Sequence, residues 1–462
     1  MTDSQATDQP ERLRQKGRPR NSDAAARSLT AILNLVRTWR ANTRQELERE
    51  SELGRAIVSD RLATLADLGL VDESELGEAS GGRAPRLVQF KAERARIVVA
   101  TLDQTALGVG LADLSGRLLT EHHEELDLSA PAEATVARLG TLFDWLLGKD
   151  ASPAPLWGIG ISAPGPVQLP PGDDFLAGSP SFLPAWENHP FIEQLTVRFR
   201  APAWIRSSVE TMAVGELHAS GGAGASDMLF VKVGKRIGAS AICDGRLYRG
   251  AQGAAGLIGQ LPVTSGARTA PLDLMAGSDM IAREGRAAAE AGASPVLADI
   301  LARIGAITAI DVGQAAQMGD AVSMEVMSRS GHLIGHVVAA LANMLNPSII
   351  VLSGSIAQTN DILLAAVRET VYGESHPLVT RDLKISASRM GSSAGLAGAA
   401  KVVSEALFDP DLMREWITHG APTAMPRFRA TLAQIDALLS GSGRAERPAP
   451  PPSANAHSDR PS

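Results

Sequence analysis

The chain has 462 residues, too many for one ordinary hydrophobic core, and this length predicts two or three folding units. Apolar residues make up 44% and charged residues 21%, as is usual for globular proteins, and the net charge is −7. The single cysteine, Cys243, excludes an internal disulfide framework and a multi-cysteine zinc site. No apolar stretch reaches about 18 residues and the N-terminus is polar, so we expect a cytoplasmic protein without a membrane partner.

Positive charge is concentrated at the N-terminal end of this acidic chain. Residues 11–61 contain twelve Lys and Arg but only seven Asp and Glu. A basic segment on an acidic body is expected when one module binds nucleic acid. We interpret residues 1–22 as a basic flexible arm, whose sequence GRPR at 17–20 resembles the core of an AT-hook that lies in a narrow minor groove. Arg18 and Arg20 are therefore candidate DNA contacts; the alternative is a solvated basic terminus.

Residues 23–92 carry the pattern of a winged helix-turn-helix. An apolar stripe predicts a first helix, Thr43 and Glu46 predict a capping box that starts a second, and Gly54 precedes a third. The stripes consist of Leu29, Ile32, Leu33 and Val36 in the first helix and Ile57, Val58, Leu62, Leu65 and Leu68 in the third. A strand, a mobile tip and a second strand follow in VDESELGEASGGRAPRLVQF, as in a wing.

In such a domain the first residues of the third helix face base edges, and the wing reaches phosphate or the minor groove. The candidate DNA contacts are Arg55, Ser59 and Arg61 on the helix and Arg83 and Arg86 in the wing. Four acidic residues weaken the near side of the wing as a DNA contact: Asp72, Glu73, Glu75 and Glu78. The alternative is a three-helix module for protein contacts, but the local charge, the turn spacing and the wing favour DNA.

Beyond residue 94, strands and helices alternate, with glycine turns at strand ends. The pattern predicts strands in 96–102 and 106–119, the second turning at 114–116, and a helix at 133–147. A later helical stripe ends at Asn346-Pro347 and is followed by a buried strand. The stripe consists of Ile334, Val337, Val338, Leu341 and Met344. This alternation predicts an α/β body that binds a ligand at the turns.

Four segments of this body resemble the ROK family of sugar kinases and sugar-responsive repressors: GIGISAPGPV, FLPAWENHPF, GRLYRGAQGAAGLIGQ and NPSIIVLSGS. The resemblance covers residues 96–408 and implies an actin-like two-lobed fold. The N-terminal domain is similar to the repressor branch of the family and is absent from its kinases. The expected fold class is therefore α/β, with an N-terminal winged helix-turn-helix followed by an actin-like two-lobed ROK domain.

The positions that transfer phosphate in the family's kinases are replaced in this chain. In the first phosphate loop the kinases have an Asp and glycines where this chain has Thr101 and Asp103, and a carboxylate there repels phosphate. The second loop, Gly-Thr-Gly-Ile-Gly in the kinases, reads GKRIG at 234–238. The catalytic Asp corresponds to Ser208, which is no base near neutral pH, and a helix would aim Glu210 elsewhere. We therefore expect no catalytic residue, no cofactor and no kinase activity.

The resemblance also indicates where a small effector would bind. The candidate effector contacts are Ser181, Ser207, Ser208, Gln260 and Asp273. Their side chains can hydrogen-bond a sugar or sugar derivative. The family's zinc-binding cysteines are replaced in LPVTSGARTAPLDLMAG, so no metal is expected. His332 and His336 have the i, i+4 spacing of a metal pair, but helix packing explains them better because their neighbours are apolar.

The sequence predicts a helix or two at 409–439 and, from its Pro, Ser and Ala content, a disordered tail at 440–462. The combined hypothesis is a DNA-binding transcriptional regulator, a repressor of carbohydrate-related genes, in which a catalytically inactive kinase-like domain senses the effector. The homodimer and its operator DNA follow from the resemblance. Two alternatives stay open: a divergent ATP-dependent sugar kinase with an appended DNA-binding module, and a sensor that acts through protein contacts.

Overall fold

The computed structural model describes residues 23–76, 86–103, 106–167, 179, 186–187, 189–219 and 226–441. Several expected features lie outside these residues: the arm at 1–22 with Arg18 and Arg20, the wing residue Arg83, the effector candidate Ser181, and the tail after residue 441.

Three helices and a short antiparallel strand pair form the N-terminal unit. Its elements are α1 (Asp23–Arg37), α2 (Arg44–Ser51), α3 (Arg55–Asp67), β1 (Val71–Asp72) and β2 (Gln89–Phe90). The predicted apolar stripe of α1 is buried. Thr43 and Glu46 form the predicted capping box, which places Leu47 in the core.

The prediction for the third helix was wrong at one position. Val58, Leu62 and Leu65 are buried as expected, but Ile57 is 42% exposed. Adjacent helical residues are separated by about 100° around the axis, so Ile57 cannot share the inward direction of Val58. An apolar side chain therefore lies on the exposed surface of α3.

The first lobe is built on a five-stranded sheet with the order β5-β4-β3-β6-β7. Its strands are β3 (Arg96–Leu102), β4 (Ala106–Asp113), β5 (Leu118–Glu125), β6 (Leu156–Ala163) and β7 (Ala203–Ser207). The predicted hairpin joins β4 to β5, where Gly116 adopts φ +85°. A glycine suits this turn because other residues rarely adopt positive φ.

Side chains of β3 alternate between two cores, one on each face of this sheet. Val98 and Ala100 pack with α4 (Ala132–Lys149) and α5 (Phe191–Phe199). Ile97 and Val99 point to the opposite face, toward the C-terminal helices. The predicted helix at 133–147 lies within α4.

The second lobe contains another five-stranded sheet, with the order β10-β9-β8-β13-β14. Its strands are β8 (Met228–Lys232), β9 (Gly238–Cys243), β10 (Arg246–Tyr248), β13 (Ile349–Ser353) and β14 (Lys384–Ala387). The predicted buried strand is β13, which runs parallel to both neighbours, β8 and β14. Helix α6 (Ser208–Ala219) covers one face of the sheet and the remaining helices of this lobe cover the other.

Those remaining elements lie between residues 258 and 380. They are η3 (Ile258–Gln260), β11 (Pro262–Ser265), β12 (Arg268–Pro271), α7 (Leu272–Ala276), α8 (Ser278–Glu290), α9 (Pro295–Ile304), α10 (Ala309–Gln317), α11 (Ala321–Leu345), α12 (Ser355–Thr359), α13 (Asp361–Glu374) and α14 (Pro377–Thr380). Helix α11 stops before Asn346 as predicted, but Met344 is 81% exposed rather than inward. In the last turn Leu341 and Leu345 pack against the core, and Met344 points about 100° away from Leu345 around the helix axis.

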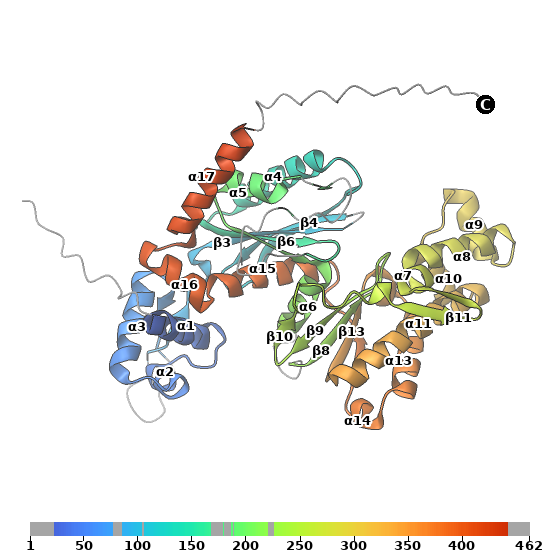
Figure 1. Ribbon diagram of the computed structural model, residues 1–462, viewed down its shortest axis with the longest axis horizontal. Coiled ribbons are helices and arrows are strands. Elements are labelled where there is room, and N and C mark those ends of the chain that lie inside the picture. The colour runs from blue at the N-terminus through green and yellow to red at the C-terminus, as the bar shows by residue number, and fades with distance from the viewer. Residues whose placement is uncertain are drawn as a thin grey trace, which may run out of the picture.

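The C-terminal helices connect the N-terminal unit to the first lobe. They are α15 (Ser393–Leu407), α16 (Pro410–Trp416), η4 (Ile417–His419), η5 (Pro422–Ala424) and α17 (Pro426–Gly441). Figure 1 shows α15 running beneath the first-lobe sheet and α16 lying between that sheet and the N-terminal unit. One continuous apolar core includes Leu33 of α1, Val99 of β3 and Trp416 of α16. Within the described ranges, no helix combines the length and apolar character needed to span a bilayer.

Candidate functional site

Ser207 and Ser208 lie where β7 ends and α6 begins. The Ser207 hydroxyl accepts a hydrogen bond from the backbone N–H of Glu210 at 3.3 Å. The Glu210 carboxylate accepts in return from the backbone N–H and the hydroxyl of Ser207, both at 2.9 Å. These reciprocal bonds form a capping box, so the Ser207 side chain serves the start of α6.

Glu210 is buried and uses both carboxylate oxygens within the protein. Oε2 accepts from Ser207, and Oε1 accepts from Nε of Arg249 at 2.8 Å. Arg249 follows β10 and belongs to the second lobe. The carboxylate nearest to Ser208 along the chain is therefore engaged in a helix cap and an ion pair.

Ser208 lies beside an ion pair that joins the two lobes. Nζ of Lys232, at the end of β8, is 3.0 Å from the Asp103 carboxylate, which follows β3. The same Nζ is 3.5 Å from the Ser208 hydroxyl. Lys232 and Ser208 are largely buried, whereas the Asp103 side chain is 53% exposed. The position that resembles the kinases' first phosphate loop thus carries a carboxylate paired with a lysine of the second lobe.

Gln260 and Asp273 form a second group. The buried Asp273 carboxylate accepts hydrogen bonds from the backbone N–H of Ile237 at 2.6 Å and from Gln260 Nε2 at 3.2 Å. Arg236 adds an ion pair at 3.4 Å, and Lys235 pairs with Asp279 at 3.3 Å. Asp273 therefore anchors the GKRIG loop, and both cations of that loop have carboxylate partners.

The structure thus pairs four of the five effector candidates, Ser207 with Ser208 and Gln260 with Asp273. The start of β9 links the two pairs. Gly238 packs so closely on α6 that an added Cβ would lie 2.9 Å from Val209, and the preceding residue, Ile237, donates its backbone N–H to Asp273. Sequence reasoning missed Lys232 and Arg249, the cations beside the serines. A lysine inside the apolar run LFVKVG is the one signal that marked Lys232, and nothing in the sequence pairs Arg249 with Glu210.

The described DNA-contact candidates lie on α3 and just before β2. Arg55 on α3 and Arg86 before β2 are exposed. The Ser59 hydroxyl accepts from Arg44, whose guanidinium also forms two hydrogen bonds to Glu73. Arg61 instead turns toward α1 and donates to the Ser28 hydroxyl at 2.7 Å; it also pairs with Asp60. Arg55 and Arg86 are thus the most available of the described candidates, while Arg61 is partly committed to packing.

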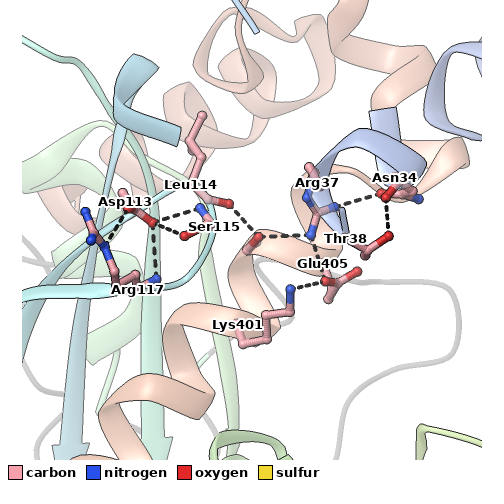
Figure 2. A network of polar contacts seen from close by, with 10 residues as sticks. Asn34, Arg37, Thr38, Asp113, Leu114, Ser115, Arg117, Lys401 and Glu405 are labelled. Carbon is pink, nitrogen blue, oxygen red and sulfur yellow. Dashed lines mark hydrogen bonds and ion pairs between the residues drawn. The ribbon is translucent and has the colours of Figure 1, made fainter. Parts of the chain in front are cut away.

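A polar network joins α1 to α15 (Figure 2). The Arg37 side chain is only 2% exposed and its guanidinium is 2.7 Å from Glu405, which also pairs with Lys401 at 2.5 Å. Arg37 also donates to Asn34 at 2.8 Å and lies over the Phe408 ring. The network continues through Ser404, which donates to the Leu114 carbonyl in the β4–β5 turn at 2.6 Å.

Burial and charge shift the protonation of this network. Burial lowers the pKa of Lys401, and the Glu405 carboxylate offsets part of that shift. Burial opposes ionisation of Glu405, but the Arg37 and Lys401 cations outweigh it and lower its pKa. At the end of α6, burial together with Lys401 lowers the pKa of His218 to about 4. His218 is therefore uncharged at neutral pH.

The two histidines with i, i+4 spacing point toward α13. His332 Nδ1 is 2.9 Å from Thr370 Oγ1, and His336 Nδ1 is 2.8 Å from Glu374 Oε2. Among the residues that the structure describes, no group of three or more His, Cys, Asp or Glu side chains is placed to hold a metal ion.

Two lobes, each with a five-stranded sheet, and the helix pair α6 and α15 between them define a mixed α/β protein of the actin-like class. The chain belongs to the ROK family, whose model matches residues 102–406.

Relatives of two kinds match this chain. It is 26% identical over 397 residues to the xylose repressor of Caldicellulosiruptor bescii, covering 82% of this chain and 96% of the relative. The regulator NagC of Escherichia coli is 22% identical, covering 84% and 95%. The glucokinase of Halalkalibacterium halodurans is 28% identical but covers 56% of this chain and 80% of the kinase.

Solved structures give the same division. A ROK family transcriptional regulator, a homologue of the E. coli Mlc protein, covers 86% of this chain and 100% of its own with a TM-score of 0.71 and 22% identity. A ROK family glucokinase from Streptomyces griseus covers 67% and 99% with a TM-score of 0.55 and 20% identity. At these identities the likeness establishes the fold, and the regulator shares more of it than the kinase does.

Proposed function

We propose that this protein is a sugar-responsive transcriptional repressor of carbohydrate-related genes that binds operator DNA as a homodimer. The observation that carries the proposal is the continuous core shared by the N-terminal unit and the first lobe. A DNA-binding unit built into the body in this way can respond to what the body binds. The repressor relatives support the same reading, because their matches extend beyond the family domain at 102–406.

The N-terminal unit acts in this proposal as a winged helix-turn-helix. Helix α3 enters the major groove with Arg55, Ser59 and Arg61 near its start, and the segment between β1 and β2 forms the wing with Arg83 and Arg86. The arm adds Arg18 and Arg20 in the minor groove. Ile57 joins these candidates, since an exposed apolar side chain at this position can contact a thymine methyl group.

The body acts as a sensor without catalysis. Ser208 stands where the family's kinases have their base, and Glu210 is engaged by Ser207 and Arg249. A general base typically accelerates such a step by about 10² to 10⁴, so its loss removes a large part of kinase activity. Effector binding near Ser207, Ser208, Gln260 and Asp273, with Ser181, would then shift the balance between two arrangements of the lobes.

The test uses point variants of the full chain, because deletion of the N-terminal unit would expose the shared core. DNA fragments bound by the purified protein are selected at a stated salt concentration to define the operator. Arg55→Ala should then weaken operator binding by about 1–3 kcal/mol while leaving non-specific binding nearly unchanged. The matched control is Arg381→Ala, an exposed arginine of the second lobe, which should leave operator binding unchanged. Sequence-blind binding by the wild type would refute the proposal.

The alternative is a divergent sugar kinase with an appended DNA-binding module. The glucokinase relative and the fold shared with a solved ROK family glucokinase favour it. We would adopt this alternative if the protein turned over ATP in the presence of magnesium and any hexose. The activity would also have to disappear in a variant that disrupts the region around Ser208. We expect no turnover above the rate without protein.

A further inference from the structure

Two cations of the second lobe flank the start of α6. Lys232 approaches Ser208 from the end of β8, and Arg249 approaches Ser207 through Glu210. The Arg249 guanidinium lies beside Gly253, whose added Cβ would be 2.8 Å from Nη2 and 3.1 Å from the Val167 carbonyl of the first lobe. Both positive charges therefore lie at the junction between the lobes, on either side of the two adjacent serines.

This junction also holds polar atoms whose hydrogen-bonding capacity is unused. Nη2 of Arg249 and the hydroxyl of Ser353 are buried without a hydrogen-bond partner among the described residues. Ser353 pairs in register with Lys232 across β13 and β8, so the two side chains share one face of the sheet. A buried donor without a partner costs free energy, and such groups are uncommon unless something else satisfies them.

The partner of Lys232 is the exchangeable member of this group. Asp103 comes from the first lobe and its carboxylate is half exposed, whereas Glu210 is buried and bonded on both oxygens. Because the Asp103 side chain is half exposed, solvent competes for its carboxylate and limits the net stability that the ion pair contributes. A second oxyanion can therefore replace Asp103 at Lys232, whereas displacing Glu210 from Arg249 would disrupt the cap of α6.

We propose that the effector is an anion whose phosphate or carboxylate group binds Lys232 and the Ser208 hydroxyl and displaces Asp103. The proposal rests on the sensor role given above and specifies the chemistry of its ligand. Because Lys232 and Asp103 belong to different lobes, this exchange removes an ion pair between them when the ligand binds. Ligand chemistry and lobe arrangement are then coupled through one lysine.

The test measures oxyanion binding by the full chain at constant ionic strength. Glucose 6-phosphate, gluconate and inorganic phosphate are titrated by calorimetry, with glucose as the neutral probe. Lys232→Met should weaken binding of the preferred oxyanion by at least about tenfold, because a hydrogen bond to a charged group is lost. Asp103→Asn should tighten it by up to about fivefold, because the internal competitor is removed.

Lys384→Met is the matched control, since it removes the same charge from an exposed lysine at the start of β14, at the opposite end of the sheet from Lys232. It should bind the oxyanion like the wild type, and comparison of phosphate with carboxylate identifies the preferred group. Three outcomes would overturn the proposal: equal oxyanion binding by all four proteins, tight binding of glucose alone, or no binding of any probe. These measurements contain no DNA, so their failure is distinct from a failure to bind an operator.

Discussion

The two junctions of this molecule are built differently. Between the N-terminal unit and the first lobe, one apolar core runs without interruption and includes the tilted rings of Trp157 and Trp416, whose centroids are 5.5 Å apart. Between α6 and the second-lobe sheet the buried apolar cluster is small, and the two lobes are also joined by an ion pair between Lys232 and the half-exposed Asp103. We infer that the N-terminal unit moves with the first lobe, and that changes of arrangement occur between the lobes.

Helices α6 and α15 connect the two junctions. They cross so closely that a Cβ added at Gly398 would lie 1.6 Å from the Thr211 carbonyl. Helix α6 begins at Ser208, and near its C-terminal end α15 contacts Arg37 through Glu405. A displacement of α6 therefore reaches the N-terminal unit through rigid helices rather than through a flexible loop. Four predictions test this contrast.

The largest effect is expected at the apolar junction. Trp416→Ala should lower the free energy of unfolding by about 3–5 kcal/mol, because the side chain is fully buried and its indole N–H donates to Leu407 at 2.9 Å. Urea denaturation gives the value. Trp145→Ala is the control, since Trp145 is 38% exposed, and it should lose much less. Similar losses in both variants would mean that the core does not hold the junction.

The close crossing of α6 and α15 should be the next most sensitive feature. Gly398→Ala should destabilise by about 1–3 kcal/mol, because the added methyl group meets backbone and the helices must separate. Gly373→Ala is the control: it is also helical, nothing lies within 4 Å, and alanine favours the helix. Thermal unfolding should order the proteins as Gly373→Ala, wild type and Gly398→Ala, from most to least stable.

The comparison also shows which features the sequence could reveal. The stripe of α1, the Thr43–Glu46 capping box and the Asn346 helix end depend on neighbours along the chain, and all were predicted correctly. Ile57 and Met344 were misplaced because periodicity finds a stripe but does not set its edges. The pairs Lys232–Asp103 and Arg37–Glu405 join residues more than a hundred positions apart, so only the folded chain brings them together.

The polar part of the N-terminal junction should contribute less than its apolar core. Arg37→Met keeps apolar contact with Phe408 but removes the bonds to Glu405 and Asn34, so we expect a loss of about 1–2 kcal/mol. Glu405 retains Lys401, which limits the cost. Arg381→Met, in an exposed pair with Asp382, should be nearly neutral by urea denaturation. If Arg37→Met left the free energy of unfolding unchanged, apolar packing alone would hold this junction.

The smallest expected effect is a pH dependence at the end of α6. The pKa of His218 is about 4 in the folded protein, lowered by burial and by Lys401 from an ordinary value of 6.5. The unfolded chain therefore binds a proton first, and stability is lost as the pH falls from about 6.5 toward 4. Part of the His218 residue is solvent-exposed, and screening limits this loss to less than about 1 kcal/mol. The free energy of unfolding should fall less between pH 7 and pH 5 in His218→Gln than in the wild type, by that amount. Glu405 titrates in both proteins and therefore does not affect the comparison. An equal fall in both proteins would show that His218 is protonated equally in the folded and unfolded states.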